Sequence, residues 1–119
     1  MTEKTLTTSD LRQFTGSETW YRHWFNRRIT FTDGVKYVAD HGGAYWLIDE
    51  IVFGQDVSAV KAEEFQVWKL TVENRSATLT CEDGNFNVVF TKKIDFTDFP
   101  LAEITIWFTD NVLLLPSEY

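Results

Sequence analysis

Residues 65–90 read FQVWKLTVENRSATLTCEDGNFNVVF, and most of what the sequence predicts about architecture starts from them. Apolar and polar residues alternate through this stretch, as they do in strands that bury one face. Asp83-Gly84-Asn85 separates two such runs, and because these residues tolerate positive φ angles the triplet predicts a hairpin turn. The residues expected on the buried face are Trp68, Leu70, Val72, Ala77, Leu79, Cys81, Phe86, Val88 and Phe90.

The alternation continues towards the end of the chain. Ile104, Ile106 and Phe108 again occupy every second position, and Asp110-Asn111 predicts a further turn into residues 112–115. The second half is therefore expected to form an antiparallel meander of four to five strands with one buried face. Residues 112–115 fit either an inner strand or an edge strand that pairs with a second copy.

The first half has a different period. Residues 34–41 and 44–53 each place apolar side chains at helical spacing, with Gly42-Gly43 as a break between two helices and Asp33 as the expected N-cap. A short helix is expected over 11–14, and a hairpin between 20–25 and 29–32. Residues 54–62 fit a loop or a short helical turn. We therefore predict a single α+β domain over residues 1–119, in which the short helix, the hairpin and the helical pair pack on the meander.

Composition limits the class of protein. A chain of 119 residues fits one domain, and its single cysteine cannot form an internal disulfide. The polar N-terminal residues predict no signal peptide, and the longest apolar run, residues 44–48, is too short to span a bilayer. We expect a cytoplasmic protein without membrane contact. The net charge of −7 favours solubility or a basic partner and disfavours direct binding to nucleic acid.

No residue pattern predicts catalysis, a metal site or a cofactor. The two histidines and Cys81 lack the spacing of zinc ligands, and Cys81 lies in phase with the buried residues of its strand. Four aspartates lie near aromatic residues, but three of them have ordinary capping, turn or surface explanations. The enzyme alternative, a nucleotide-processing activity, would use Asp33 and Asp49 with His23 or His41, while Asp95 and Asp98 are further carboxylate candidates.

The segment from Trp20 to Arg28 is the strongest candidate for binding a partner. Arginines beside stackable rings are typical of protein-binding hot spots and of single-stranded nucleic acid surfaces, although such rings also pack inward in structural roles. The second half adds carboxylates that could face a basic surface. The partner-binding candidates are Trp20, Tyr21, Arg22, Trp24, Arg27, Arg28, Glu63, Glu64, Glu82 and Asp83.

Several motifs resemble those of an uncharacterised family of small bacterial proteins carried on plasmids, phages and other mobile elements. They are QFTG (13–16), TDGV (32–35), GAYWL (43–47), TDFPL (97–101) and LLLPSEY (113–119). The resemblance covers the chain from about residue 10 to its end. It implies a genomic setting and carries no catalytic role.

That setting makes a non-enzymatic protein-binding module the first hypothesis, in particular an anti-CRISPR or other anti-defence inhibitor that occupies a basic groove of a host nuclease complex. An accessory or regulatory protein of a mobile element is the alternative, before the enzyme. A binding module should expose an aromatic cluster or a continuous acidic face. An enzyme should show a concave pocket in which a histidine meets a carboxylate. The oligomeric state remains open.

Overall fold

The computed structural model describes residues 6–16 and 19–119. The Ser17-Glu18 pair and the first five residues, part of the stretch used for the signal-peptide prediction, lie outside the described residues. The helices are α1 (Thr8–Leu11), α2 (Asp33–Gly42), α3 (Tyr45–Gly54), α4 (Ser58–Lys61) and the 3-10 helix η1 (Pro116–Glu118). The strands are β1 (Trp20–Arg22), β2 (Thr30–Thr32), β3 (Phe65–Glu73), β4 (Ser76–Glu82), β5 (Val88–Ile94), β6 (Glu103–Thr109) and β7 (Val112–Leu114).

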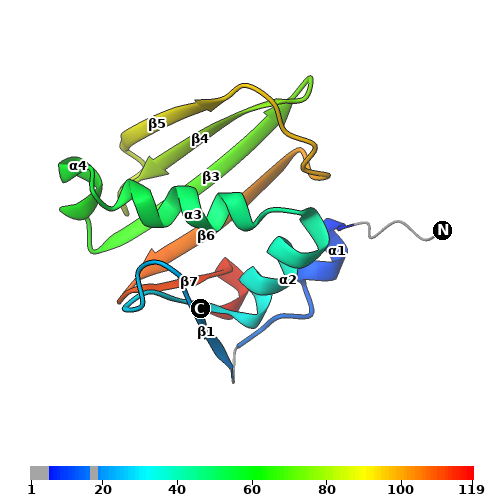
Figure 1. Ribbon diagram of the computed structural model, residues 1–119, viewed down its shortest axis with the longest axis horizontal. Helices are drawn as coiled ribbons and strands as arrows, with labels where there is room; N and C mark the ends of the chain where they lie inside the picture. Colours follow the sequence, from blue (N-terminus) through cyan, green and yellow to red (C-terminus); the bar gives the residue numbers. More distant parts are fainter. Residues whose placement is uncertain (1–5, 17–18) are drawn as a thin grey trace.

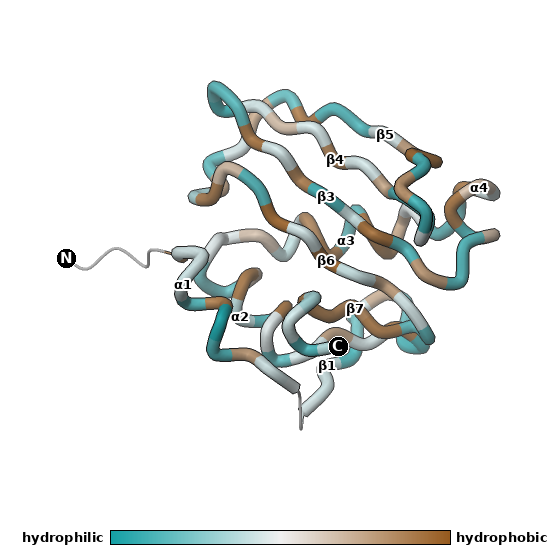
Figure 2. Tube along the Cα trace, turned by 180° about the vertical axis from the view of Figure 1, so that it is seen from behind, coloured by the Kyte–Doolittle hydropathy of each residue, from teal (hydrophilic) through white to brown (hydrophobic). Residues whose placement is uncertain are grey.

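One seven-stranded sheet forms the base of the α+β fold, in the order β1-β2-β7-β6-β3-β4-β5. All neighbouring strands are antiparallel except β2 and β7, which are parallel. Helices α2 and α3 lie across one side of this sheet, as Figure 1 shows. In the opposite view, hydrophobic and hydrophilic residues alternate along β3, β4 and β6 (Figure 2).

The alternation predicted for β3 and β4 is confirmed. Trp68, Leu70, Leu79 and Cys81 are all buried at 1% exposure or less. Trp68, Leu70 and Leu79 lie against Leu47 and Ile51 of α3, whereas α2 packs on α3 and on β1, β2 and β7. The two helices bury Val35, Val38, Ala39, Leu47, Ile48, Ile51 and Val52 in the same core. The helical pair therefore closes the core over the sheet, and its period of 3.6 matches what the sequence predicts.

The ends of the helices differ slightly from expectation. The N-cap of α2 is Thr32, whose hydroxyl accepts a hydrogen bond from the Val35 amide at 3.3 Å, whereas Asp33 is the first helical residue. Gly43 ends this helix in the left-handed conformation, with φ at 62°, as a glycine after a helix commonly does. The short first helix lies at Thr8–Leu11, earlier than predicted, because Thr7 and Asp10 form a capping box.

The predicted arrangement of the strands needs two corrections. The N-terminal hairpin is not a separate unit packed on the sheet, because β2 pairs with β7 and so extends the same sheet. The second half is also not a simple meander. Residues 95–102 lead the chain from β5 back to the other side of β3, where β6 pairs with it. Residues 112–115 consequently supply an inner strand.

The start of β5 is a third correction. Phe86 and Val88 were expected to face the core, but they are 83% and 55% exposed. The register between β4 and β5 shifts at Cys81/Glu82, so that Phe86 and Val88 are out of phase with Phe90, which pairs with Cys81 and packs against the core as predicted. Phe86 itself has a φ of 69° and lies in the turn rather than in the strand.

The β3–β4 turn provides a test of local backbone strain. Asn74 and Arg75 have φ angles of 54° and 65°, as a two-residue type I′ turn requires. We expect Arg75→Gly to raise the free energy of unfolding by about 0.5–1 kcal/mol, because glycine adopts this conformation without a Cβ clash. Urea denaturation measures the change. Arg75→Ala removes the same side chain but keeps the Cβ, so an equal gain in that variant would contradict the explanation.

Candidate docking surface

The loop between β1 and β2 folds around a buried imidazole. His23 is only 1% exposed, and its Nδ1 accepts hydrogen bonds from the backbone amides of Phe25 and Asn26, both at 3.1 Å. The amide of His23 donates to the Ile29 carbonyl at 2.9 Å, which closes the base of the loop. The imidazole therefore determines the backbone path from residue 23 to residue 29.

The other ring nitrogen reaches helix α3. His23 Nε2 lies 2.8 Å from Asp49 Oδ1, and the indole Nε1 of Trp24 donates to the same oxygen at 2.9 Å. Because Nδ1 accepts two amide hydrogens, the proton of the neutral ring is on Nε2 and is donated to Asp49. Both ring nitrogens are thus occupied by the protein itself, and neither is open to a substrate.

Three exposed rings surround this network, and we call Trp24, Phe25 and Phe53 the aromatic trio. Their exposed fractions are 65%, 63% and 43%. The ring centroids of Trp24 and Phe25 are 5.4 Å apart, those of Phe25 and Phe53 5.4 Å, and those of Trp24 and Phe53 6.4 Å, with interplanar angles of 60–84°. Such edge-to-face contacts are favourable between aromatic rings. The trio is therefore one continuous apolar patch.

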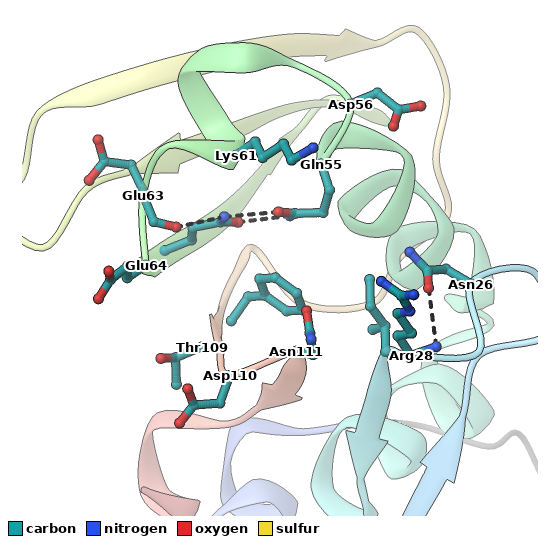
Figure 3. Close-up of a pocket in the computed structure, with 13 residues that line it drawn as sticks. Asn26, Arg28, Gln55, Asp56, Lys61, Glu63, Glu64, Thr109, Asp110 and Asn111 are labelled. Carbon is teal, nitrogen blue, oxygen red and sulfur yellow. Dashed lines mark hydrogen bonds between the residues drawn. The ribbon is translucent and has the colours of Figure 1, made fainter.

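A polar cleft of about 470 Å³ lies beside the trio. Asn26 and Arg28, just after Phe25, line one side, and Gln55 and Asp56, just after Phe53, line another. Figure 3 shows Glu63, Glu64, Thr109 and Asp110 on the side away from Arg28. The cleft carries charges of both signs, since Lys61 also contributes to its lining.

The back of the cleft is held by a pair of glutamines. Gln55 and Gln66 exchange two amide hydrogen bonds of 2.8 and 2.9 Å, and Gln66 also accepts from the indole of Trp68 at 2.9 Å. Gln66 donates further to the carbonyls of Val60 and Glu63. Because its amide is saturated within the protein, Gln66 positions the connection around α4 and has no free group to offer a ligand.

Neither histidine lies in this cleft. His23 and Asp49 do meet, but they are not among the cleft-lining residues. His41 stacks on Tyr37 with ring centroids 3.9 Å apart, and its Nδ1 lies 3.1 Å from the Tyr37 carbonyl. The lining of this cleft therefore contains no histidine, and the exposed rings of the trio lie beside it.

The six aromatic and arginine candidates of the first half lie in different environments. Trp20 is 54% exposed on edge strand β1, whereas Tyr21 is half-buried and stacks on Phe31 at 5.8 Å. Arg22, Arg27 and Arg28 are exposed, and Arg22 Nη1 donates to the Arg27 carbonyl at 2.7 Å. Tyr21 thus has a packing role, and the others remain available at the surface.

The acidic candidates gather at one end of the sheet. Glu63 and Glu64 line the cleft, and Glu82 pairs with Lys69 at 3.3 Å. Asp83 accepts hydrogen bonds from the Asn85 and Asn87 amides and from the Asn87 side chain, and these bonds, that of the side chain foremost, lower its pKa below the usual value. Glu73, by contrast, ends β3 at the opposite end of the sheet.

Cys81 behaves as a core residue. It is fully buried, and burial, together with the nearby charges of Glu63, Glu82 and Asp83, raises the pKa of its thiol to about 12. At pH 8 the folded protein therefore holds almost no thiolate, the form that reacts with disulfides. We expect Ellman's reagent to label Cys81 only in denaturant, with at least about a hundredfold slower labelling of the folded protein. Rapid stoichiometric labelling of the native protein would contradict its burial.

Comparison with known families adds one result. Residues 5–119 match the model of a family of unknown function, DUF6876. The chain belongs to the DUF6876 family. This confirms the expectation of an uncharacterised family that extends over nearly the whole chain. No curated protein and no solved structure matches it.

Two features are absent from the part of this DUF6876 chain that the structure describes. Among residues 6–16 and 19–119, no three His, Cys, Asp or Glu side chains come together as metal ligands would. Over the same residues, no helix has the length and apolarity needed to cross a membrane.

Of the aromatic trio, the sequence analysis named only Trp24 as a partner-binding candidate. Phe25 lies in the segment proposed for binding but was not among its candidates, and Phe53 is distant in sequence and was interpreted only as the end of a helix. Phe53 lies four residues after Asp49, on the polar side of α3, and this position was an available signal. A large aromatic side chain on the polar face of an amphipathic helix is exposed unless another segment covers it.

Proposed function

We propose that this DUF6876 protein is a non-enzymatic protein-binding module whose docking surface is the aromatic trio. The observation that carries the proposal is the combination of large exposed rings with a hydrogen-bonded network, centred on buried His23, that holds the Trp24 indole and the Phe25 backbone. Aromatic residues, Phe included, and Arg are enriched at protein–protein interfaces, and the residues that contribute most to affinity cluster in compact patches. The trio and the neighbouring arginines have this composition.

The network matters because it reduces the cost of binding. Trp24 is held by its hydrogen bond to Asp49, and the backbone of Phe25 by its hydrogen bond to His23. Side chains that are already fixed lose less conformational entropy when a partner covers them. The trio is therefore better suited to tight association than three freely rotating surface rings would be.

The alternative enzymatic use of His23 and Asp49 has less support. A general base needs a nitrogen that can reach a substrate proton, and both nitrogens of His23 already have protein partners. The same contacts are what a positioning role requires. We therefore assign His23 and Asp49 to the support of the docking surface.

A finer proposal concerns the partner's origin. The resemblance to proteins of plasmids, phages and other mobile elements supports a partner in a host defence system, such as a CRISPR nuclease complex, and a cytoplasmic location. For a partner with a basic groove, the relevant surface would be the acidic end of the sheet at Glu63, Glu64, Glu82 and Asp83. Its support is the proximity of Glu63, Glu82 and Asp83, whose charges all act on Cys81.

A comparative pull-down from bacterial lysate tests the main proposal. We expect wild-type protein to enrich a specific partner, and the double variant Phe25→Ala/Phe53→Ala to lose at least about 90% of it, because truncated hot-spot residues cost at least tenfold in affinity. Neither ring makes a side-chain hydrogen bond, so the double variant should fold. Phe96→Ala is the matched control, since Phe96 is 65% exposed but lies outside the trio.

Each result has a defined meaning. Equal capture by the wild type, the double variant and the control would refute the trio as the docking surface. A partner that is lost with Glu63→Lys/Glu64→Lys instead would move the site to the acidic end of the sheet, as the inhibitor proposal requires. Capture of no partner by the wild type would count against the binding-module proposal itself.

A further inference from the structure

The arginines of the docking surface have no salt-bridge partners within the described chain. Arg22, Arg27 and Arg28 are all exposed, and none of the salt bridges between described residues involves them. This is unexpected in a protein with 18 acidic and only 11 basic residues. The segment from residue 20 to residue 28 contains no acidic residue at all. The rings of Trp24 and Phe25 are thus presented by a locally basic segment of an acidic protein.

Two carboxylates of helix α3 already have partners within the protein. Asp49 accepts hydrogen bonds from His23 and Trp24 through the same oxygen, and Glu50 pairs with Lys92 at 2.8 Å. Asp56 lines the cleft together with Arg28 and is exposed. Glu63, Glu64 and Asp110 also line the cleft, on the side away from Arg28 (Figure 3). The positive charge is therefore a property of the segment from residue 20 to residue 28, which holds three arginines and no carboxylate.

Two arginines are also held in place. Arg22 donates to the carbonyl of Arg27, which ties its guanidinium to the loop, and the backbone of Arg28 is held by its amide's 3.1 Å hydrogen bond to Asn26 Oδ1. Arg28 then lines the cleft beside Lys61, so a second cation is available there. A planar guanidinium forms paired hydrogen bonds with a carboxylate, which makes arginine the preferred partner of acidic side chains at interfaces.

We infer that the partner segment of this docking surface is an acidic peptide, in which an apolar side chain packs on the aromatic trio and flanking Asp or Glu side chains pair with Arg22, Arg27 and Arg28. This inference rests on the proposed protein-binding function. The protein's net charge of −7 does not oppose it, because charges separated by more than about 8 Å are largely screened at physiological salt. Contacts at the interface are then governed by the local charge.

The ring geometry favours a peptide over single-stranded nucleic acid. Nucleic acid surfaces offer ring faces on which successive bases stack. In the trio each ring meets its neighbours at 60–84°, so ring edges and faces cover one another and leave a compact apolar patch. Such a patch fits between the aliphatic or aromatic side chains of a protein partner better than between flat bases.

Selection from a phage-displayed random peptide library on the immobilised wild-type protein tests the inference. We expect the selected peptides to contain an aromatic or large aliphatic residue flanked by Asp or Glu. Synthetic versions should lose at least about tenfold in affinity for Arg27→Glu/Arg28→Glu, and their binding should weaken as salt increases. Arg75→Glu is the control, because Arg75 lies in the β3–β4 turn at the other end of the sheet.

The outcomes separate this inference from the function on which it rests. Peptides that require Phe25 and Phe53 but are neutral or basic would overturn the acidic-partner inference and leave the docking surface intact. Peptides that bind equally to Phe25→Ala/Phe53→Ala would overturn both. A fluorescein-labelled oligothymidylate provides the other arm. If the wild-type protein binds this oligonucleotide, the Arg27→Glu/Arg28→Glu variant does not, and no acidic peptides are selected, then the partner would be a nucleic acid and not a peptide.

Discussion

His23→Ala is expected to lower the free energy of unfolding by about 3 kcal/mol, since it removes a buried ring and leaves buried polar groups without partners. The amides of Phe25 and Asn26 lose their acceptor, and Asp49 loses one of its two donors. Water that enters the site can replace some of the lost hydrogen bonds. The ring itself is only 1% exposed, however, and its removal leaves a cavity. Chemical denaturation followed by circular dichroism measures the loss of stability.

Asp49→Asn is the informative companion of this substitution. The amide oxygen of asparagine can still accept from His23 Nε2 and from Trp24 Nε1, so we expect a cost below about 1 kcal/mol. If His23 were a buried imidazolium, removal of the negative charge would instead cost several kcal/mol, as for other broken buried ion pairs. A large effect of Asp49→Asn would therefore contradict the neutral ring inferred from its hydrogen bonds.

The same variants connect stability to binding. His23→Ala should release Phe25 and Trp24 from their fixed positions while both rings remain in the chain. A variant that stays folded but binds a partner more weakly would show that fixing the rings contributes to affinity. Phe25→Ala/Phe53→Ala, in contrast, removes contact area and leaves the His23 network in place. Comparison of the two separates preorganisation from contact.

The sequence predicted those parts of the fold that depend on local patterns. Alternation identified the buried faces of β3, β4 and β6, and helical spacing with Gly42-Gly43 identified α2 and α3, because both signals repeat within one element. The start of β5 was predicted on the wrong face, since the bulge at Cys81/Glu82 puts Phe86 and Val88 out of phase with Phe90, which faces the core as predicted. The parallel pairing of β2 with β7 depends on contacts between the two ends of the chain and has no local signature.

The candidate site shows the same division. Rings and arginines between Trp20 and Arg28 were visible as an unusual composition, which is a local property. The contact of His23 with Asp49 spans 26 positions, and nothing in either neighbourhood specifies it. Asp49 was correctly placed on the polar side of its helix. Its role in holding His23 and Trp24 depends on the loop between β1 and β2, which the fold brings against that side of the helix.

Glu118 gives the second large expected effect. It is 9% exposed, and its carboxylate accepts from the Thr32 hydroxyl at 2.6 Å, from the Gly34 amide at 3.1 Å and from the Leu115 amide at 2.9 Å. Gly34 lies in the first turn of α2, where the amide dipoles favour a negative charge. The carboxylate thus joins the C-terminal segment to the start of a helix 84 residues away in sequence.

We expect Glu118→Gln to destabilise the protein by about 2 kcal/mol. The three donors need acceptors, but an amide replaces one oxygen with a donor and removes the charge. Thermal unfolding monitored by circular dichroism should show a clear decrease in Tm, whereas Glu103→Gln, on an exposed strand position, should change little. Equal effects of the two substitutions would mean that the buried carboxylate has no special role.

A double-mutant cycle between Gly34 and Glu118 tests whether the two positions are energetically coupled. A Cβ at Gly34 would lie 2.6 Å from Glu118 Oε1 and 2.7 Å from a methyl group of Leu115, so Gly34→Ala alone must displace the carboxylate and is expected to cost about 2–3 kcal/mol. Glu118→Ala removes two of the three closest atoms that the added methyl group would meet and leaves the Leu115 methyl group. The double variant should therefore be more stable than the sum of the single effects predicts, by more than about 1 kcal/mol. Strict additivity in this double-mutant cycle would show that the helix start and the C-terminal carboxylate act independently, against the geometry in which they share one site.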